Sequence, residues 1–383
     1  MAKKNILRVG LVLDDGLDKP DGVQQYVLTL GEWLSVQGHE VRYLVGETTR
    51  DDIPGLYSLS KNIGVKSNGN FMTIPLPTSH TQLLSVLATE KFDVLHVQTP
   101  YSPFMGGRLI HLASPKTAII GTFHILPNSW ITHHATRLLG FYLQRSIRKF
   151  DTMMSVSEAA ADFAERTFNI ESIVVPNVFD YDRFSSAKPL KKYNDSTKTI
   201  LFLGRLVPRK GCEALIKAIH LLSDQKDLPK YRVVICGSGP EESKLRHDVK
   251  RYGLSDIVEF AGFVEEDEKP KYFASADISV FPSSGGESFG IVLLEALASG
   301  RSAVLAGNNS GYRSVMDKQP DLLFDPMDIE MLASRLTNLL EDSNHRDEMA
   351  AWGREYSKQF DIKVVGPKIV DIYIKALRKR NEK

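Results

Sequence analysis

Strand-like runs alternate with segments of helical periodicity along almost the whole chain. A strand-like run over Ile6–Asp14 is followed by a helical pattern over Gly22–Gln37. The same order restarts at Ile200–Leu206, ahead of a helical pattern over Gly211–Leu222. This alternation is typical of stacked βαβ units, in which helices join parallel strands. It predicts an α/β fold with two doubly wound, Rossmann-like domains.

The remaining strand candidates fall into one group in each half of the chain. Within the first half, residues 47–80 show few periodic apolar positions, so we expect an irregular segment there, with at most a short strand at Met72–Pro75. The other expected strands are Val41–Val45, Asp93–Gln98, Ala118–His124, Thr152–Ser157, Ile173–Pro176, Arg232–Cys236, Val258–Phe263, Ile278–Phe281 and Ala303–Leu305.

The length and one charged stretch predict the domain boundaries. A chain of 383 residues is too long for one ordinary core and suits two domains. We expect an N-terminal domain over 1–180, a linker over 181–198, and a C-terminal domain over 199–360. A C-terminal helix over 361–383 can pack back on the first domain. Two such domains in tandem would face a cleft, with ligands at the carboxyl ends of the strands.

Composition excludes several classes of function. The chain carries 48 Lys plus Arg against 47 Asp plus Glu, so no global field attracts nucleic acid or an anionic membrane. Two cysteines, Cys212 and Cys236, are too few for a disulfide framework or a zinc cluster, and we expect no metal site. The N-terminus looks like a buried strand and not a signal peptide, and no apolar run approaches the roughly 20 residues of a spanning helix. A cytoplasmic location is expected.

Glu287 and Glu295 are the most informative pair of candidate functional residues. Gly285 and Gly286 precede them, and an apolar helix over Phe289–Ala298 carries the second glutamate. A helix N-terminus with adjacent glycines binds anions such as phosphate, and an unpaired buried carboxylate is costly. The alternative is a surface glutamate and a paired helix-face charge. The glycines and the apolar helix favour a ligand that carries both phosphate and hydroxyl groups, such as a sugar nucleotide.

Basic and glycine-rich turns follow two other strands of the second half. Arg205 and Lys210 lie between a strand and a helix, where a guanidinium fork and an ammonium suit phosphate oxygens. A solvated basic loop is the alternative, and the strand–turn–helix position favours phosphate binding. Gly237 and Gly239 open the next helix and permit close backbone approach, although a plain helix-entry turn explains them equally well.

Two strand ends of the first half carry further candidates. Gly22 begins a helix after the first strand, and Asp21 suits an ordinary helix cap. His124 ends an apolar strand, where it either hydrogen-bonds a substrate or satisfies backbone groups. His133 and His134 lack a partner at metal-ligand spacing.

Seven motifs in order resemble family 4 of the retaining glycosyltransferases, which have the two-domain GT-B fold. They are PDGVQQYVLTLGEWLSVQGHEV, GTFH, MSVSEAA, VVPNVFD, GRLVPRKG, ICGSGPEE and GESFGIVLLEALASG. Within that family the chain is similar to phosphatidylinositol mannosyltransferases of the bacterial inner leaflet, through GESFGIVLLEA and GYRSVM. The resemblance implies front-face transfer of a hexose with retained configuration and no obligatory metal.

The resemblance also assigns roles to individual residues. It implies that Arg205 and Lys210 hold the donor diphosphate, that Glu295 holds the ribose, and that Glu287 and His124 contact the transferred sugar. Of these residues, the implied catalytic group comprises Arg205, Lys210, Glu287 and His124. The rest of the implied donor site comprises Gly22, Gly237, Gly239, Val264, Ser288, Phe289, Gly290 and Ile291, and the implied acceptor site comprises Asp15, Asp21, Gln24 and His124.

Two departures concern the acceptor. Asp21 replaces the first glycine of the usual Gly-Gly-Val loop, and Asp14 and Asp15 stand where the inositol enzymes carry a Pro-Tyr pair. Gln24 matches the family. The resemblance implies GDP-mannose, or alternatively UDP-glucose, as donor and a lipid or lipid-linked acceptor. A soluble or polysaccharide acceptor, or a catalytically silent scaffold, is the alternative. An NAD-dependent dehydrogenase is set aside because no G-x-G-x-x-G follows the first strand.

One segment is a candidate for membrane contact. Arg137–Phe150 places apolar residues on one helical side and Arg145, Arg148 and Lys149 on another. A basic amphipathic helix can lie in a headgroup layer, which would attach the protein peripherally to the inner membrane face. Packing of the apolar side on the first sheet is the alternative.

Overall fold

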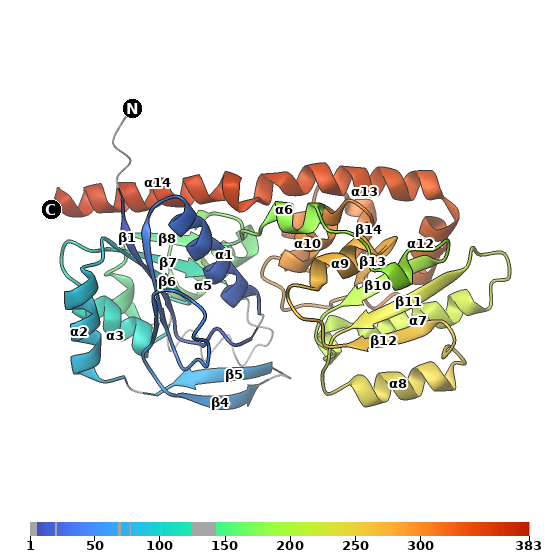
Figure 1. The fold of residues 1–383 in the computed structure, drawn as a ribbon, viewed down its shortest axis with the longest axis horizontal. Coiled ribbons are helices and arrows are strands. Elements are labelled where there is room, and N and C mark those ends of the chain that lie inside the picture. Colours follow the sequence, from blue (N-terminus) through green and yellow to red (C-terminus); the bar gives the residue numbers. More distant parts are fainter. Residues whose placement is uncertain are drawn as a thin grey trace. The chain divides into compact units, whose positions relative to one another are not determined.

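The computed structural model describes residues 6–19, 21–67, 70–76, 78–100, 102–124 and 143–382. The chain divides into two compact units. The first unit comprises Met1–Val178 together with Ile362–Lys383, and the second comprises Phe179–Asp361. Figure 1 shows that each unit has its own sheet flanked by helices. The α/β architecture expected from the alternating pattern is confirmed.

The first unit is built on a parallel sheet that has seven strands in the described residues. Its strand order is β3-β2-β1-β6-β7-β8-β9, so the chain passes from β1 outward to β3 and then crosses to the other side of β1. The sheet strands are β1 (Arg8–Leu13), β2 (Glu40–Val45), β3 (Leu56–Ser58), β6 (Val94–Gln98), β7 (Ala118–Phe123), β8 (Thr152–Ser155) and β9 (Ile173–Val174).

The segment expected to be irregular contains three strands. β3 joins the main sheet, and β4 (Asn62–Ser67) pairs with β5 (Asn70–Pro75) in a separate antiparallel hairpin. The prediction of a single short strand there was wrong in extent. Its mixed Gly, Asn and Ser composition hides strands whose stability comes from pairing with each other, which periodicity does not report.

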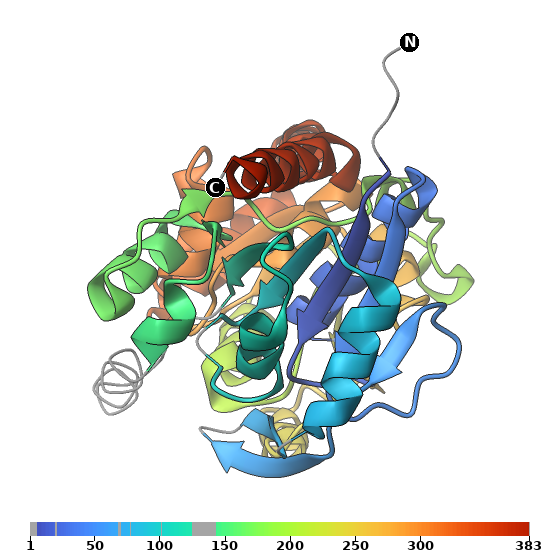
Figure 2. The same cartoon turned by 90° about the vertical axis from the view of Figure 1, so that its left-hand side faces the viewer.

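Helices cover both faces of the first sheet. On one face, α1 (Gly22–Val36) and α14 (Ile362–Asn381) pack in a cluster with Val9, Leu11 and Ile120. On the other face, α2 (His80–Glu90) and α3 (Met105–Leu112) pack with Val12, Leu95 and Val97. Figure 2 shows α14 and α2 on opposite sides of the strands. The alternation of buried residues along β1 and β6 therefore supplies both cores, as expected for a doubly wound sheet.

The C-terminal helix α14 belongs to the first unit although it follows the second in sequence. Val365, Ile369 and Tyr373 are fully buried in it. Gly366 allows a close approach to α1, because a Cβ at this position would lie 2.7 Å from the ring of Trp33. Near the end of the helix, Arg380 Nε lies 2.7 Å from Asp151 Oδ2. Apolar packing and one ion pair thus hold this helix against the N-terminal sheet.

The second unit has a parallel sheet of six strands in the part of the chain that the structure describes. Its order is β12-β11-β10-β13-β14-β15. The strands are β10 (Lys198–Leu203), β11 (Tyr231–Cys236), β12 (Val258–Gly262), β13 (Ile278–Phe281), β14 (Ala303–Gly307) and β15 (Leu323–Phe324). The helices are α6 (Tyr181–Ser185), α7 (Cys212–Ser223), α8 (Glu242–Arg251), α9 (Lys269–Ala274), α10 (Ile291–Ser299), α11 (Ser310–Met316), α12 (Ile329–Glu341) and α13 (Ser343–Ser357), with α5 (Glu158–Phe168) in the first unit.

Residues 181–198, expected as a linker, are packed within the second unit. They contain α6, which contacts α9 and α10. Phe184 and Tyr193 are buried, and the ring of Phe184 lies 6.1 Å from that of Phe273. In the sequence this segment looks like a linker, because it is charged and its few aromatic residues show no helical or strand periodicity.

Candidate active site

The carboxyl ends of β10 and β13 carry the basic and acidic candidates of the second unit. After β10 the chain forms a short 3₁₀ turn, η2 (Pro208–Lys210), and then enters α7 through Gly211. Gly211 has φ +72°, and a Cβ there would lie 2.1 Å from the carbonyl oxygen of Pro282. Only glycine therefore lets the loop after β10 lie against the loop after β13.

Glu287 is held by two cations and a hydroxyl from this contact. Its Oε1 lies 2.7 Å from Arg209 Nη1 and 2.9 Å from Lys210 Nζ, and it accepts a 2.9 Å hydrogen bond from Ser283 Oγ. Burial disfavours the charged carboxylate, but the charges of Lys210 and Arg209 and the hydrogen bonds outweigh it and lower the pKa of Glu287. The cluster is therefore a preformed, ionised site. A sugar or phosphate oxygen arriving there would meet two cations and one carboxylate.

Arg209 and Ser283 belong to this cluster and were missed in the sequence. The backbone N–H of Ser284 donates to the carbonyl oxygen of Arg209, and Ser283 Oγ lies 3.0 Å from that oxygen. The signal for Arg209 was its place beside Lys210 in a strand–turn–helix loop. The sequence alone does not show that Arg209 contacts Glu287, because the two residues lie 78 positions apart and meet only in the folded protein.

Glu295 lies one turn inside α10 and is buried. Burial raises its pKa to about 7, against the opposing charge of Lys269. Lys269 forms an ion pair with Glu266, so its charge is shared between two carboxylates. The expectation that Glu295 follows the start of an apolar helix is confirmed, and the carboxyl group changes protonation state near neutral pH. A ligand hydroxyl can therefore donate a hydrogen bond to the ionised carboxylate or accept one from the protonated carboxyl group.

The start of α10 offers backbone N–H groups without a side-chain cap. Gly290 is the N-cap residue at φ +109° and provides no side-chain hydrogen bond. Phe289 is buried with its ring 5.8 Å from Phe360, so its contribution to any ligand comes from its backbone. Ser288 and Ile291 are half-buried on either side. A helix N-terminus without a side-chain cap suits an anion.

The glycines after β11 serve loop packing. A Cβ on Gly237 would lie 1.9 Å from the carbonyl oxygen of Gly204, and one on Gly239 would lie 2.3 Å from that of Leu206. Gly237 also has φ +138°. These glycines therefore bring the loop after β11 against the loop that carries Arg205, which is half-buried. Val264, after β12, is buried.

The first unit brings a second set of candidates to the carboxyl ends of β1, β6 and β7. Asp15 follows β1, and its Oδ1 accepts a 2.8 Å hydrogen bond from the backbone of Gly16. Gln24, buried in the first turn of α1, donates to Asp15 Oδ2 at 3.4 Å. Gly22 is exposed at the start of this helix. Asp21 is its N-cap residue, but its side chain forms no cap hydrogen bond, so the ordinary capping role is absent.

His124 has a fixed hydrogen-bonding partner at the end of β7. Its Nε2 lies 2.7 Å from Gln98 Oε1, and Gln98 Nε2 donates to the carbonyl oxygen of His96 at 3.3 Å. Because the amide nitrogen of Gln98 faces a carbonyl, its oxygen must face His124 and accept from Nε2–H. A neutral imidazole with Nε2–H keeps Nδ1 as an acceptor. Burial lowers the pKa of His124 to about 3, so the ring is neutral at physiological pH.

Asp14 is a buried carboxyl group that links β1 to α3. Its Oδ1 accepts a 2.7 Å hydrogen bond from the backbone of Gly106, and Oδ2 accepts one from Ser102 Oγ. Burial raises the pKa of Asp14 despite these bonds. The side chain thus anchors the loop between β6 and α3, while its neighbour Asp15 remains near Gln24.

The amphipathic segment expected over Arg137–Phe150 lies partly outside the described residues, which resume at Leu143. Of its apolar side, Leu143 is buried and Ile147 packs against the cluster of Phe123 and Phe163. This part of the apolar side therefore packs in the protein. Within the described residues, no helix is long and apolar enough to cross a membrane, and no group of three or more His, Cys, Asp or Glu side chains suits a metal ion.

Comparison with known proteins identifies the family. The family described as glycosyl transferases group 1 matches residues 184–356, and glycosyltransferase family 4 matches residues 20–183. The chain is 31% identical over 375 residues to the phosphatidyl-myo-inositol mannosyltransferase of Mycobacterium tuberculosis, covering 96% of each chain. It is 26% identical to the GDP-mannose-dependent monoacylated alpha-(1-6)-phosphatidylinositol monomannoside mannosyltransferase of Corynebacterium glutamicum, covering 94% of this chain and 96% of the relative.

Solved structures share the fold. Sucrose-phosphate synthase from Thermosynechococcus elongatus superposes with a TM-score of 0.75 at 19% identity, covering 97% of this chain and 99% of that one. The Anabaena protein HepE, solved with UDP and glucose, gives a TM-score of 0.69 at 18% identity, covering 95% and 98%. The chain belongs to the family 4 glycosyltransferases with the GT-B fold, and it is a hexosyltransferase that uses a nucleotide-sugar donor. The resemblance seen in the seven motifs is confirmed.

Proposed function

We propose that the protein transfers a mannosyl residue, with retained configuration, from GDP-mannose to a phosphatidylinositol-like glycolipid at the inner membrane face. The observation that carries this proposal is the similarity over 96% of the chain to phosphatidyl-myo-inositol mannosyltransferases, together with the preformed Glu287–Arg209–Lys210 cluster. GDP-mannose is favoured over UDP-glucose because a related mannosyltransferase is named for its dependence on GDP-mannose.

The chemistry proposed for the second unit follows from its charges. Lys210, Arg205 and the N–H groups at the start of α10 would receive the diphosphate and stabilise it as a leaving group. Glu287 would contact the sugar, and its ionised carboxylate suits positive charge that develops at the anomeric carbon. Glu295 would hold the ribose hydroxyls. Gly237, Gly239 and Val264 would shape the base pocket through their backbone and burial.

The acceptor would be bound by the first unit. Asp15, Asp21 and Gln24 gather at the start of α1, and His124 would accept a hydrogen bond from a sugar hydroxyl through Nδ1. Carboxylates are hydrogen-bond acceptors for hydroxyl groups, so Asp15 and Gln24 together suit a polyol ring. The same chemistry would serve a soluble glycan, so the acceptor is decided by experiment.

A transfer assay with two matched variants tests the proposed site. Glu287→Ala should reduce mannosyl transfer about a hundredfold or more, on the scale of losing one stabilising group at a reacting centre. The matched control is Glu355→Ala in the last turn of α13, whose exposed carboxylate is paired with Lys358 and has no role in the proposed site. This control should retain activity. Equal activity in both variants would rule out the proposed role of Glu287.

A thermal-shift measurement tests the donor, and the transfer assay tests the acceptor. GDP-mannose should raise the melting temperature more than UDP-glucose, because a ligand that binds only the native state stabilises it. Transfer should require phosphatidylinositol in the acceptor mixture. Transfer to a soluble glycan without lipid would contradict the lipid acceptor while leaving the donor assignment intact.

A further inference from the structure

A basic cavity lies in the first unit at the amino ends of β7 and β8. It has a volume of about 710 Å³, within the range of small-molecule sites. Its lining comes from the turn before β7, the segment before β8 and the last turn of α14. The candidate acceptor residues lie at the opposite, carboxyl edge of the same sheet. The six-residue strand β7 separates the two edges by about 20 Å.

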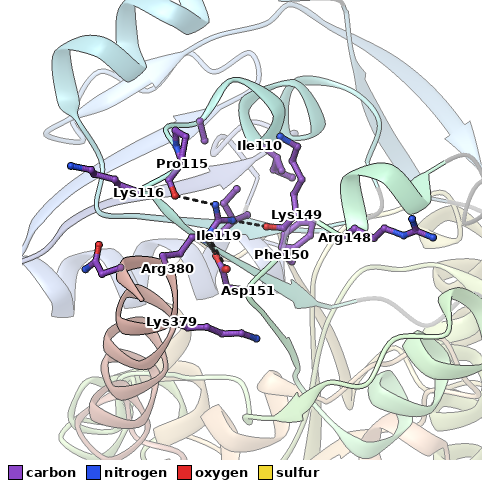
Figure 3. Close-up of a pocket in the computed structure, with 12 residues that line it drawn as sticks. Ile110, Pro115, Lys116, Ile119, Arg148, Lys149, Phe150, Asp151, Lys379 and Arg380 are labelled. Atoms are coloured by element: carbon purple, nitrogen blue, oxygen red, sulfur yellow. Dashed lines mark hydrogen bonds and ion pairs between the residues drawn. The ribbon is translucent and has the colours of Figure 1, made fainter. Parts of the chain in front are cut away.

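Arg380 builds the centre of this cavity. Its Nε donates to both oxygens of Asp151 at 2.8 and 2.7 Å, and its Nη atoms donate to the carbonyl oxygens of Pro115 and Lys149 at 3.3 and 2.8 Å. Asp151 also accepts a 2.8 Å hydrogen bond from the backbone of Ile119. Figure 3 shows these bonds tying three segments together. Arg380 and Asp151 therefore neutralise each other and fix the walls.

Four further cations surround this neutral centre. Lys116, Arg148, Lys149 and Lys379 line the cavity, and among the described residues that line it Asp151 is the only carboxylate. Within the described part of the chain, none of the four forms an ion pair. The whole chain has a net charge of only +1, so the concentration is local. It also affects a neighbour, because the pKa of His111 is lowered by burial and then by the charges of Lys149 and Arg145.

A position at the carbonyl end of a helix explains only one of these four cations. Lys379 lies in the last turn of α14, where a cation complements the carbonyl end of the helix. Lys116 lies in a turn before β7 and has no such role. In Figure 3 the side chains of Lys116 and Arg148 lie on opposite sides of the cavity and point away from one another. The accessible apolar lining is formed by Ala113, Pro115 and Phe150, because Ile110 and Ile119 are almost fully buried.

We propose that this cavity binds a phosphate group whose carbon-containing part lies on Ala113, Pro115 and Phe150, with the surrounding lysines and Arg148 turning inward on their flexible stems. Two sources share this chemistry, the headgroup of an anionic phospholipid and a soluble phosphate ester. Because the cavity lies at the opposite edge of the sheet from Asp15, Gln24 and His124, its ligand is distinct from the acceptor. The proposal does not rest on the proposed function.

Hydrogen–deuterium exchange on the full chain tests the site, because it localises protection without measuring transfer. The soluble probe is sn-glycerol 3-phosphate, and the lipid probe is a phosphatidylcholine vesicle with and without phosphatidylglycerol. Binding should protect backbone amides in residues 116–119 and 148–152. The double variant Lys116→Gln/Lys379→Gln should weaken binding about tenfold or more, because charge-assisted hydrogen bonds are lost. These side chains are exposed, so the fold should be kept.

The matched control is Lys368→Gln/Lys375→Gln, which removes two exposed lysines of α14 that do not line the cavity. It should bind as the unaltered protein does. Protection by glycerol phosphate would assign a soluble ligand, and protection only by phosphatidylglycerol vesicles would assign a lipid headgroup. Absence of protection with both probes, or equal weakening in both double variants, would overturn the proposal.

Discussion

Replacing Gln98 by Leu tests how the structure sets the tautomer of His124. The change keeps the approximate size of the side chain but removes the acceptor of His124 Nε2–H and the donor to the carbonyl oxygen of His96. Gln98, His124 and His96 are all buried, so water cannot replace these bonds freely. The Nε2–H group of His124 is then left without its partner inside the protein.

The expected loss of stability follows from these two bonds. An unsatisfied buried donor costs about 1–3 kcal/mol, and the longer bond to His96 adds about 0.5–1 kcal/mol. Gln98→Leu should therefore lower the free energy of unfolding by about 1.5–4 kcal/mol, measured by urea denaturation. Gln82→Leu, the same change at an exposed position of α2, should alter it by less than about 0.5 kcal/mol.

Nitrogen-15 NMR of the imidazole rings reports the tautomer directly. His124 should be a single Nε2–H tautomer in the unaltered protein and a mixture in Gln98→Leu. Mannosyl transfer should fall in the variant, because Nδ1 is no longer reserved as an acceptor. Unchanged His124 shifts, together with a stability loss no larger than that of Gln82→Leu, would refute the reasoning.

The buried histidines and one glycine give two further predictions. Burial lowers the pKa values of His96 and His124 to about 3, below the ordinary 6.5, so the unfolded chain binds more protons below pH 6.5. Stability should be complete above pH 6.5 and fall by about 2 kcal/mol per histidine at pH 5, measured by urea denaturation, and a flat profile would contradict this. Gly237→Ala should cost about 3 kcal/mol because its Cβ meets the carbonyl oxygen of Gly204, whereas Gly253→Ala, also at positive φ but with open space, should cost about 1 kcal/mol. Equal thermal shifts in the two variants would show that the close approach is unimportant.

Local patterns in the sequence were sufficient for the architecture and the positions of most candidate residues. Apolar runs of strand length and helical periodicity are properties of neighbouring residues, so they predicted the alternation and the two doubly wound sheets. Strand ends bearing Arg205, Lys210, Glu287 or His124 could be read the same way, because parallel strands gather their carboxyl ends at one edge. The motifs added the family, which the comparisons confirmed.

The tertiary structure decided what depends on contacts between distant segments. Arg209 joins Glu287 because Gly211 lets two loops approach, and Gln98 fixes His124 because β6 and β7 are adjacent. The packing of residues 181–198 in the second unit and the return of α14 to the first sheet are of the same kind. Their stability comes from long-range pairing and burial, which no window of local sequence contains.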